Sequence, residues 1–222
     1  MSTLFRQRTA FEKELLAELN PLVKKSKWKK ASCALFNQSG DYYQDVLVSV
    51  YRSAALTSAE LRFKPMALDP ILWEILDIPE NKDKPLSFRT WGAFTCSGLP
   101  ILEVQLEQPG SSPSEVASRL ANLCNDKVAL FQEQLSAAPF SSLVARHTNH
   151  IERGAYAVTL VASLINDGNL DMAHRTASSY LSGELSSCAT FISAGKSFHQ
   201  LTLEWLDAGN HSRFASHAAA GA

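Results

Sequence analysis

The chain has 222 residues, of which 45% are hydrophobic and 19% are charged, and its formal net charge at pH 7 is −1. This composition is typical of a folded globular protein and excludes a wholly disordered chain, a collagen-like repeat and a disulfide-stapled miniprotein. The small net charge also argues against a protein that mainly coats nucleic acid.

The chain shows the features of a cytoplasmic protein. Charged residues, among them Glu12, Lys13 and Glu14, interrupt the N-terminal region where a secretory signal would be apolar. The most apolar stretch, Ala155 to Ile165, is too short to cross a bilayer and predicts a buried helix. The four cysteines lie far apart and form no C-x-x-C pair: Cys33, Cys96, Cys124 and Cys188. We therefore expect free thiols in the cytoplasm, no metal site and no cofactor.

The first predicted element is an amphipathic helix. From Leu4 to Val23 apolar residues recur at helical spacing with charged residues between them, and Pro21 indicates a break near the end. The basic run Lys24 to Lys30 follows, and its cations suit a helix C-terminus. Residues 1–30 carry eight Lys or Arg against three Asp or Glu, so the positive charge of the chain gathers here.

Next come strands. Ala34 to Phe36 and Val46 to Val50 flank a polar turn and predict a β-hairpin. Ser58 to Lys64 alternates apolar and polar residues, so we expect one buried face and one solvent-exposed face. A short helix follows, with Asp69 as its expected N-cap and Pro70 at its first position.

Two further strands are predicted, Leu86 to Cys96 and Leu99 to Glu107, joined by Ser97 and Gly98. About five strands in successive hairpins, with helices before and after them, indicate an α+β fold built on an antiparallel sheet. Ser112 to Glu115 is a capping box that begins a long helix ending near Ser136.

The remainder of the sequence is predicted to be helical. Ala155 to Asn166 and Leu170 to Leu181, joined by Asp-Gly-Asn, form a helical hairpin, and the tail from His211 is expected to fray. We therefore divide the chain into an α+β domain, residues 1–150, and a helical C-terminal region, residues 151–222.

No catalytic motif is complete. Ser193 to Ser197 imitates the end of a phosphate-binding loop, but Thr190 stands where the first glycine belongs, and we expect a plain turn between helices. His147 and His150 are two possible metal ligands without a third. Cys96 has no histidine before residue 147 to activate it.

The sequence order resembles that of an uncharacterised bacterial family, a domain of unknown function. The likeness covers roughly residues 8–146, with Trp28 in place of the usual Phe or Tyr of the basic run. It rests on these segments: Glu14 to Leu19, Lys27 to Lys30, Val46 to Val50, Leu61 to Phe63 and Leu130 to Leu135. The resemblance implies a small cytoplasmic domain without an active site, and some members are encoded near toxins that they are thought to neutralise.

The helical hairpin is similar to a single tetratricopeptide-type helix pair, with Gly168 at the turn and Ala173 and Tyr180 in the second helix. A stacked binding groove normally needs three or more such repeats, so one pair does not predict one.

We predict a non-enzymatic protein-interaction module, in its most concrete form an immunity or antitoxin-like protein that covers the active site of a partner protein such as a toxin. The residues expected to bind the partner are Tyr42, Tyr43, Trp91, Trp205, Lys27, Trp28 and Lys29.

Two alternatives stay open. One is a hydrolytic enzyme with a composite site that uses His147 or His150, and the other is nucleic-acid binding through Lys24 to Lys30, with Trp28 as a stacking ring. For the lysines, protection of a sheet edge is the favoured explanation.

Overall fold

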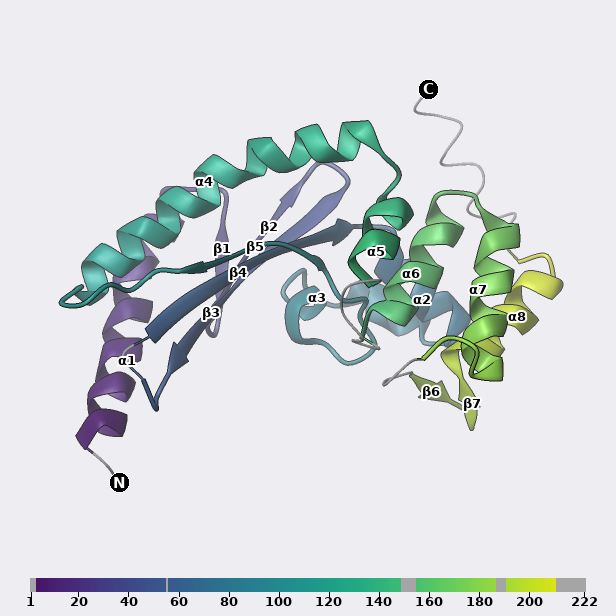
Figure 1. The fold of residues 1–222 in the computed structure, drawn as a ribbon, viewed down its shortest axis with the longest axis horizontal. Coiled ribbons are helices and arrows are strands. Elements are labelled where there is room, and N and C mark those ends of the chain that lie inside the picture. The colour runs from purple at the N-terminus through teal and green to yellow at the C-terminus, as the bar shows by residue number, and fades with distance from the viewer. Residues whose placement is uncertain (1–2, 55, 149–154, 187–190, 211–222) are drawn as a thin grey trace. The chain divides into compact units, whose positions relative to one another are not determined.

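The computed structural model describes residues 3–54, 56–148, 155–186 and 191–210 (Figure 1). The chain forms two compact units, and each unit is made of two separate stretches. The first unit combines Met1–Phe63 with Pro100–Gln134, and the second combines Lys64–Leu99 with Leu135–Ala222. This division differs from the single boundary near residue 150 that the sequence favoured.

The physical reason lies in helix α2 (Leu68–Ile75), which contacts α6 (Ala155–Asn166) and α8 (Phe198–Asp207) of the same unit. Six of the eight α2 residues are buried. Their apolar side chains belong with helices that come much later in the sequence, and a change of hydrophobic period along the chain cannot reveal such a pairing.

A five-stranded antiparallel sheet dominates the first unit and confirms the predicted α+β fold. Its strands lie in sequence order (Figure 1): β1 (Lys29–Ala31), β2 (Ala34–Ser39), β3 (Tyr42–Tyr51), β4 (Leu56–Pro65) and β5 (Leu99–Gln105). The predicted hairpin is β2–β3, in which Ser39 pairs with Tyr42. Gly40, in the two-residue turn, has a φ of +56°, which suits a residue without a Cβ.

One predicted strand is wrong. Leu86 to Cys96 contains the short helix α3 (Phe88–Trp91), and Phe94 has a φ of +58°, which no strand residue adopts. The carbonyl of Phe94 accepts a hydrogen bond from the Trp73 indole at 2.6 Å, so this backbone group bonds to a side chain of α2 and not to a neighbouring strand. The fifth strand is instead β1, which begins inside the lysine run.

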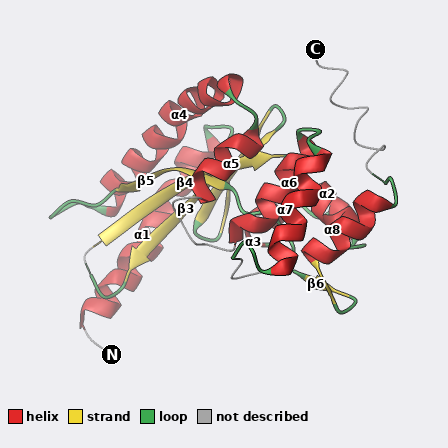
Figure 2. Cartoon of the chain, turned by 45° about the vertical axis from the view of Figure 1, so that its right-hand side comes forward, coloured by secondary structure: helices red, strands yellow, loops and turns green. Residues whose placement is uncertain are grey.

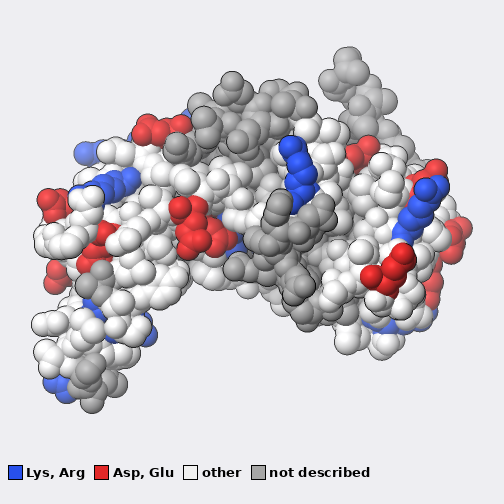
Figure 3. Space-filling view, viewed as in Figure 1, with Lys and Arg blue, Asp and Glu red and all other residues white. Residues whose placement is uncertain are grey.

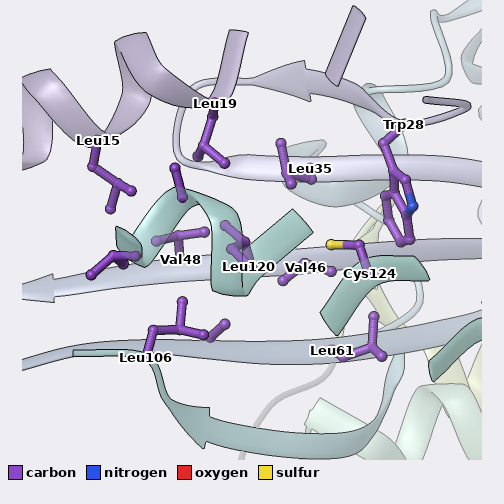
Figure 4. Close-up of a cluster of buried hydrophobic side chains, with 13 residues drawn as sticks. Leu15, Leu19, Trp28, Leu35, Val46, Val48, Leu61, Leu106, Leu120 and Cys124 are labelled. Carbon is purple, nitrogen blue, oxygen red and sulfur yellow. The ribbon is translucent and has the colours of Figure 1, made fainter. Parts of the chain in front are cut away.

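Two helices pack on one face of the sheet and form the core of the first unit with it (Figure 4). Helix α1 (Thr3–Lys24) contributes Leu15 and Leu19, and it continues through Pro21 without the predicted break. Helix α4 (Pro113–Ala137) contributes Val116 and Leu120 among others. The capping box that begins α4 is confirmed, since Glu115 accepts from the Ser112 amide at 2.7 Å and Ser112 Oγ accepts from the Glu115 amide at 3.3 Å.

A buried ion pair joins α1 to the end of β5. The Arg8 guanidinium donates to both carboxylate oxygens of Glu107, at 2.7 and 2.6 Å, and Thr57 Oγ1 donates to Glu107 at 2.7 Å. Burial acts to raise the pKa of Glu107, but these hydrogen bonds and the charge of Arg8 outweigh it and hold the pKa below its ordinary value.

The polar side of β4 is not the solvent-exposed face that its alternation predicted. Ser58 and Lys64 are buried, and Arg62 forms a bidentate ion pair with the buried carboxylate of Asp45 at 2.9 and 2.7 Å. A polar residue in an alternating strand can thus be buried when a partner satisfies it.

The second unit is mainly helical (Figure 2). It holds α2, the 3-10 helix η1 (Pro79–Asp83), α3, α5 (Phe140–Thr148), α6, α7 (Leu170–Ser182) and α8. From Tyr156 to Ile165 every residue of α6 is buried, which confirms the expected buried helix, and α6 contacts α7 as the predicted hairpin requires. Within the described residues, no helix is both long and apolar enough to cross a membrane.

Ser193 to Ser197 is not a turn between helices. Two short strands, β6 (Ile192–Ser193) and β7 (Lys196–Ser197), pair around Ala194 and Gly195, which have φ values of +48° and +78°. The tail from His211 lies outside the described residues.

Candidate binding site

The end of α1 sets the position of Trp28. The Lys25 amide donates to the Leu22 carbonyl at 3.3 Å and the Ser26 amide to the Val23 carbonyl at 3.0 Å, which tightens the last turn. Ser26 Oγ donates to the Val23 carbonyl at 3.0 Å and accepts from the Trp28 amide at 3.1 Å. The chain thereby reverses within a few residues, and the Trp28 ring enters the core, where only 5% of the residue stays exposed.

The lysines around this turn point to solvent. Lys24, Lys25, Lys27 and Lys29 are exposed, and within the described part of the chain none of them forms an ion pair. Lys30 differs, because it is half-buried and its Nζ donates to the Leu16 carbonyl at 2.9 Å. Four uncompensated positive charges therefore lie within six residues.

Two adjoining hollows meet at this turn. The first is an apolar cavity of about 240 Å³, with walls from three elements: Leu19 and Leu22 of α1, Leu35 of β2, and Ala121 and Cys124 of α4. The second is an open hollow of about 620 Å³ that Lys24, Lys27 and Asn37 help to line. Both are lined by Lys25, Ser26, Trp28 and Cys124. We call the two hollows together the lysine–tryptophan recess.

The recess combines a neutral interior with a charged rim. Figure 4 shows Trp28 beside Cys124, with Leu19 and Leu35 on neighbouring elements. Cys124 is 1% exposed, and burial raises the pKa of its thiol to about 12, so the thiol is protonated at neutral pH and acts as an apolar wall. The site can bind a negatively charged group and an apolar group side by side.

The aromatic residues predicted as exposed anchors do not form one surface. Tyr43 and Trp205 are buried, with 1% and 7% exposure, and Tyr43 stacks on Phe36 at 6.4 Å between ring centroids. Tyr42 is half-buried against Phe63, and Trp91, at 51%, is the most exposed of the four. Of the predicted residues, Lys27, Trp28 and Lys29 are the ones that lie together.

A buried polar network in the second unit surrounds Asp69, which is not the N-cap of α2. Its Oδ1 accepts from Lys64 Nζ at 2.9 Å and from the Cys96 amide at 2.8 Å, and its Oδ2 accepts from Arg89 at 2.9 Å. Lys64 also donates to the Cys96 carbonyl at 2.7 Å. Sequence reasoning missed this network because Lys64 lies at a polar position of an alternating strand. The one signal was an aspartate at the start of a mostly apolar helix.

Cys96 belongs to that network, and its thiol is held in the protonated form. It is 3% exposed, and burial, with the negative charge of Asp69, raises the pKa of its thiol far above neutral pH. The cations that could stabilise a thiolate, Lys64 and Arg89, are both bound by Asp69.

The histidines do not form a reactive centre in the described residues. His147 packs edge-on against Tyr156 at 4.8 Å, while His150 lies outside the described residues. His199 is buried and stacks on Tyr180 at 4.8 Å, and neither of its ring nitrogens has a hydrogen-bond partner within the described residues. Burial lowers the pKa of His199 to about 4.

The lysine of the phosphate-loop imitation lies against a carboxylate. Lys196 of the phosphate-loop imitation donates to Glu204 at 2.7 Å. Among the residues that the structure describes, no three His, Cys, Asp or Glu side chains gather as a metal ion requires.

No protein-family profile, curated protein or solved structure matches the chain. The resemblance to the bacterial family of unknown function stays a prediction.

Proposed function

We propose that the chain is a non-enzymatic protein-binding module whose binding site is the lysine–tryptophan recess. The observation that carries this proposal is the set of three exposed lysines, Lys24, Lys25 and Lys27, which line the recess next to an apolar cavity and form no ion pair in the described residues. Protein interfaces commonly combine an apolar centre with a charged rim that fixes orientation. The biological form we propose is the immunity-type role that the family resemblance implies, in which binding covers a partner's active site.

The state of the reactive side chains supports a binding role. Cys96 and Cys124 are buried protonated thiols, and Lys64, Asp69 and Arg89 bind one another. A catalytic group must reach its substrate, and none of these five side chains is more than slightly exposed.

Nucleic-acid binding is the second candidate, and two observations count against it. The ring of Trp28 is buried, whereas a stacking platform must present its face to the bases. On the face shown in Figure 3, the described Lys and Arg residues are scattered, with uncharged, Asp or Glu residues between them, and form no continuous basic surface.

The test is a selection of peptides from a random library displayed on phage, with the whole chain as bait. The selected peptides are then synthesised and titrated against three proteins. These are the natural sequence, a recess variant (Lys24→Glu, Lys25→Glu and Lys27→Glu), and a control variant with the same change of charge elsewhere (Lys13→Glu, Lys82→Glu and Lys84→Glu), at positions that are also exposed.

We expect the peptides to bind the natural sequence and the control alike and to lose about tenfold or more in affinity for the recess variant. Equal binding to all three proteins would place the site elsewhere and overturn the proposal. Tighter binding of a single-stranded DNA oligonucleotide, declining steeply with salt, would favour the nucleic-acid alternative.

A further inference from the structure

The cavity behind the lysines has the size and chemistry of a pocket for one side chain. Its volume is about 240 Å³. An engineered apolar protein cavity of about 150 Å³ binds benzene, so this one has room for a phenyl ring or a large aliphatic side chain. Its walls are mainly apolar and consist of Leu and Val side chains, Ala121, the Trp28 ring and a protonated thiol, while Lys25, Ser26 and Asn122 are its polar lining residues.

Lys25 lines both the cavity and the open hollow beside it. A group that entered the cavity would therefore have a cation next to it, and further cations, Lys24 and Lys27, along the open side. Within the described residues these lysines have no acidic partner, so a ligand with carboxylates on both sides of its apolar group would supply the missing charge.

We infer that the recess recognises an acidic segment of a partner protein and that one large apolar side chain of this segment enters the cavity beside Trp28. The inference rests on the proposed function and adds to it the chemistry of the partner. Burial of the apolar side chain away from water contributes most of the affinity. Attraction between the carboxylates and the lysines orients the segment and speeds its association.

Ala121 of α4 limits the size of the partner side chain that can enter the cavity. Ala121 is half-buried and lines the cavity, so a larger side chain at this position occupies the space that the anchor needs. The cavity variant Ala121→Met fills the space without a change of charge. Because position 121 is partly open to solvent, α4 can keep its packing through Leu120 and Cys124, which are buried.

The experiment compares two synthetic peptides, Asp-Glu-Glu-Phe-Glu-Glu-Asp and the same peptide with Ala in place of Phe, by calorimetric titration of the whole chain. We expect the Phe peptide to bind about tenfold or more tightly, because burial of the ring contributes to binding. Ala121→Met should remove that difference while the weak binding of the Ala peptide stays the same. Thermal unfolding of the variant checks that the fold is kept.

The outcomes separate the inference from the proposed function. Both peptides could bind equally well and lose affinity together in the recess variant. The lysines would then bind acidic segments, but the inference that an apolar side chain enters the cavity would be overturned. If neither peptide distinguishes the natural sequence from the recess variant, both ideas fail. If decanoate binds the cavity tightly while neither peptide binds, the recess takes a free amphiphilic anion, and the inference is again overturned.

Discussion

Lys64 Nζ lies 2.9 Å from Asp69 Oδ1, with side-chain exposures of 1% and 0%. Asp69 also accepts from Arg89 and from the Cys96 amide, so one carboxylate balances two cations and ties β4, α2 and the segment after α3 together. Buried charges are tolerated only when they are paired and hydrogen-bonded, and this group satisfies both conditions.

Removal of the Asp69 carboxylate should therefore be costly. We expect Asp69→Ala to lower the free energy of unfolding by about 4 kcal/mol, because Lys64 and Arg89 would remain as buried or partly buried charges without their counterion. Urea denaturation measures the change. Lys82→Met is the matched control: its Nζ lies 3.9 Å from Glu74 at an exposed position, and it should change stability by less than about 0.5 kcal/mol. An equal loss in both variants would contradict a structural role of the network.

His199 makes stability depend on pH. Its pKa in the folded chain is about 4, below the ordinary value of about 6.5, so the unfolded chain binds more protons between these two pH values. The contribution of neutral His199 to the free energy of unfolding is fully present above about pH 6.5. It is lost as the pH falls toward 4, by up to about 3 kcal/mol.

Replacement of His199 tests this dependence. In His199→Phe, urea denaturation at about pH 7 and about pH 4.5 should show a much smaller difference than in the natural sequence, since a phenyl ring can stack on Tyr180 without taking up a proton. His174→Gln is the control, because His174 is about half exposed, and it should keep the full difference. The prediction fails if His199→Phe loses as much stability on acidification as the control.

The two buried thiols should resist alkylation. Burial raises the pKa of both Cys96 and Cys124, so iodoacetamide at about pH 8 meets little thiolate at either position. In a Cys188→Ser background we expect Cys33, which is partly exposed, to react first, and Cys96 and Cys124 to react after urea unfolding. Mass spectrometry of digested protein locates the label, and prompt labelling of Cys96 would revive it as a candidate nucleophile.

Trp28 and Trp91 should differ sharply in their effect on stability. Trp28→Ala removes a ring that is part of the core and should cost about 3 kcal/mol or more, whereas Trp91→Ala removes a ring that is half exposed and should cost less than about 1 kcal/mol. Thermal or urea unfolding of the two variants measures the change in the free energy of unfolding. Similar values would mean that the core of the first unit does not depend on Trp28.

Local signals in the sequence predicted many elements correctly. The Ser112–Glu115 capping box, the hairpin around Gly40 and the buried helix from Ala155 each depend on residues close together in the chain. The prediction of a strand over Leu86 to Cys96 was wrong because this segment packs on α2 instead of a sheet: the Phe88 ring lies against Trp73, and the Phe94 carbonyl accepts from the Trp73 indole. Alternation alone does not distinguish that environment from a strand.

Only part of the candidate site could be predicted from the sequence. The lysine run and Trp28 are evident in the sequence, but the cavity also needs Ala121 and Cys124 of α4, and no pattern in the sequence shows that α4 meets the end of α1. The same limit applies to Lys64: its burial follows from the position of Asp69, whereas its place in β4 predicted exposure.

The division of the first unit into two stretches determines the order in which it can be completed on the ribosome. Strands β2 to β4 and α1 are synthesised first, but α4, which covers their apolar face, and β5, which closes the sheet beside β4, follow only after the whole 64–99 segment. Helix α2, which lies in that segment, lacks its packing partners until α6 and α8 have been synthesised. A nascent chain that ends before residue 124 lacks part of α4, so apolar side chains of the future core stay accessible, and such exposure favours aggregation.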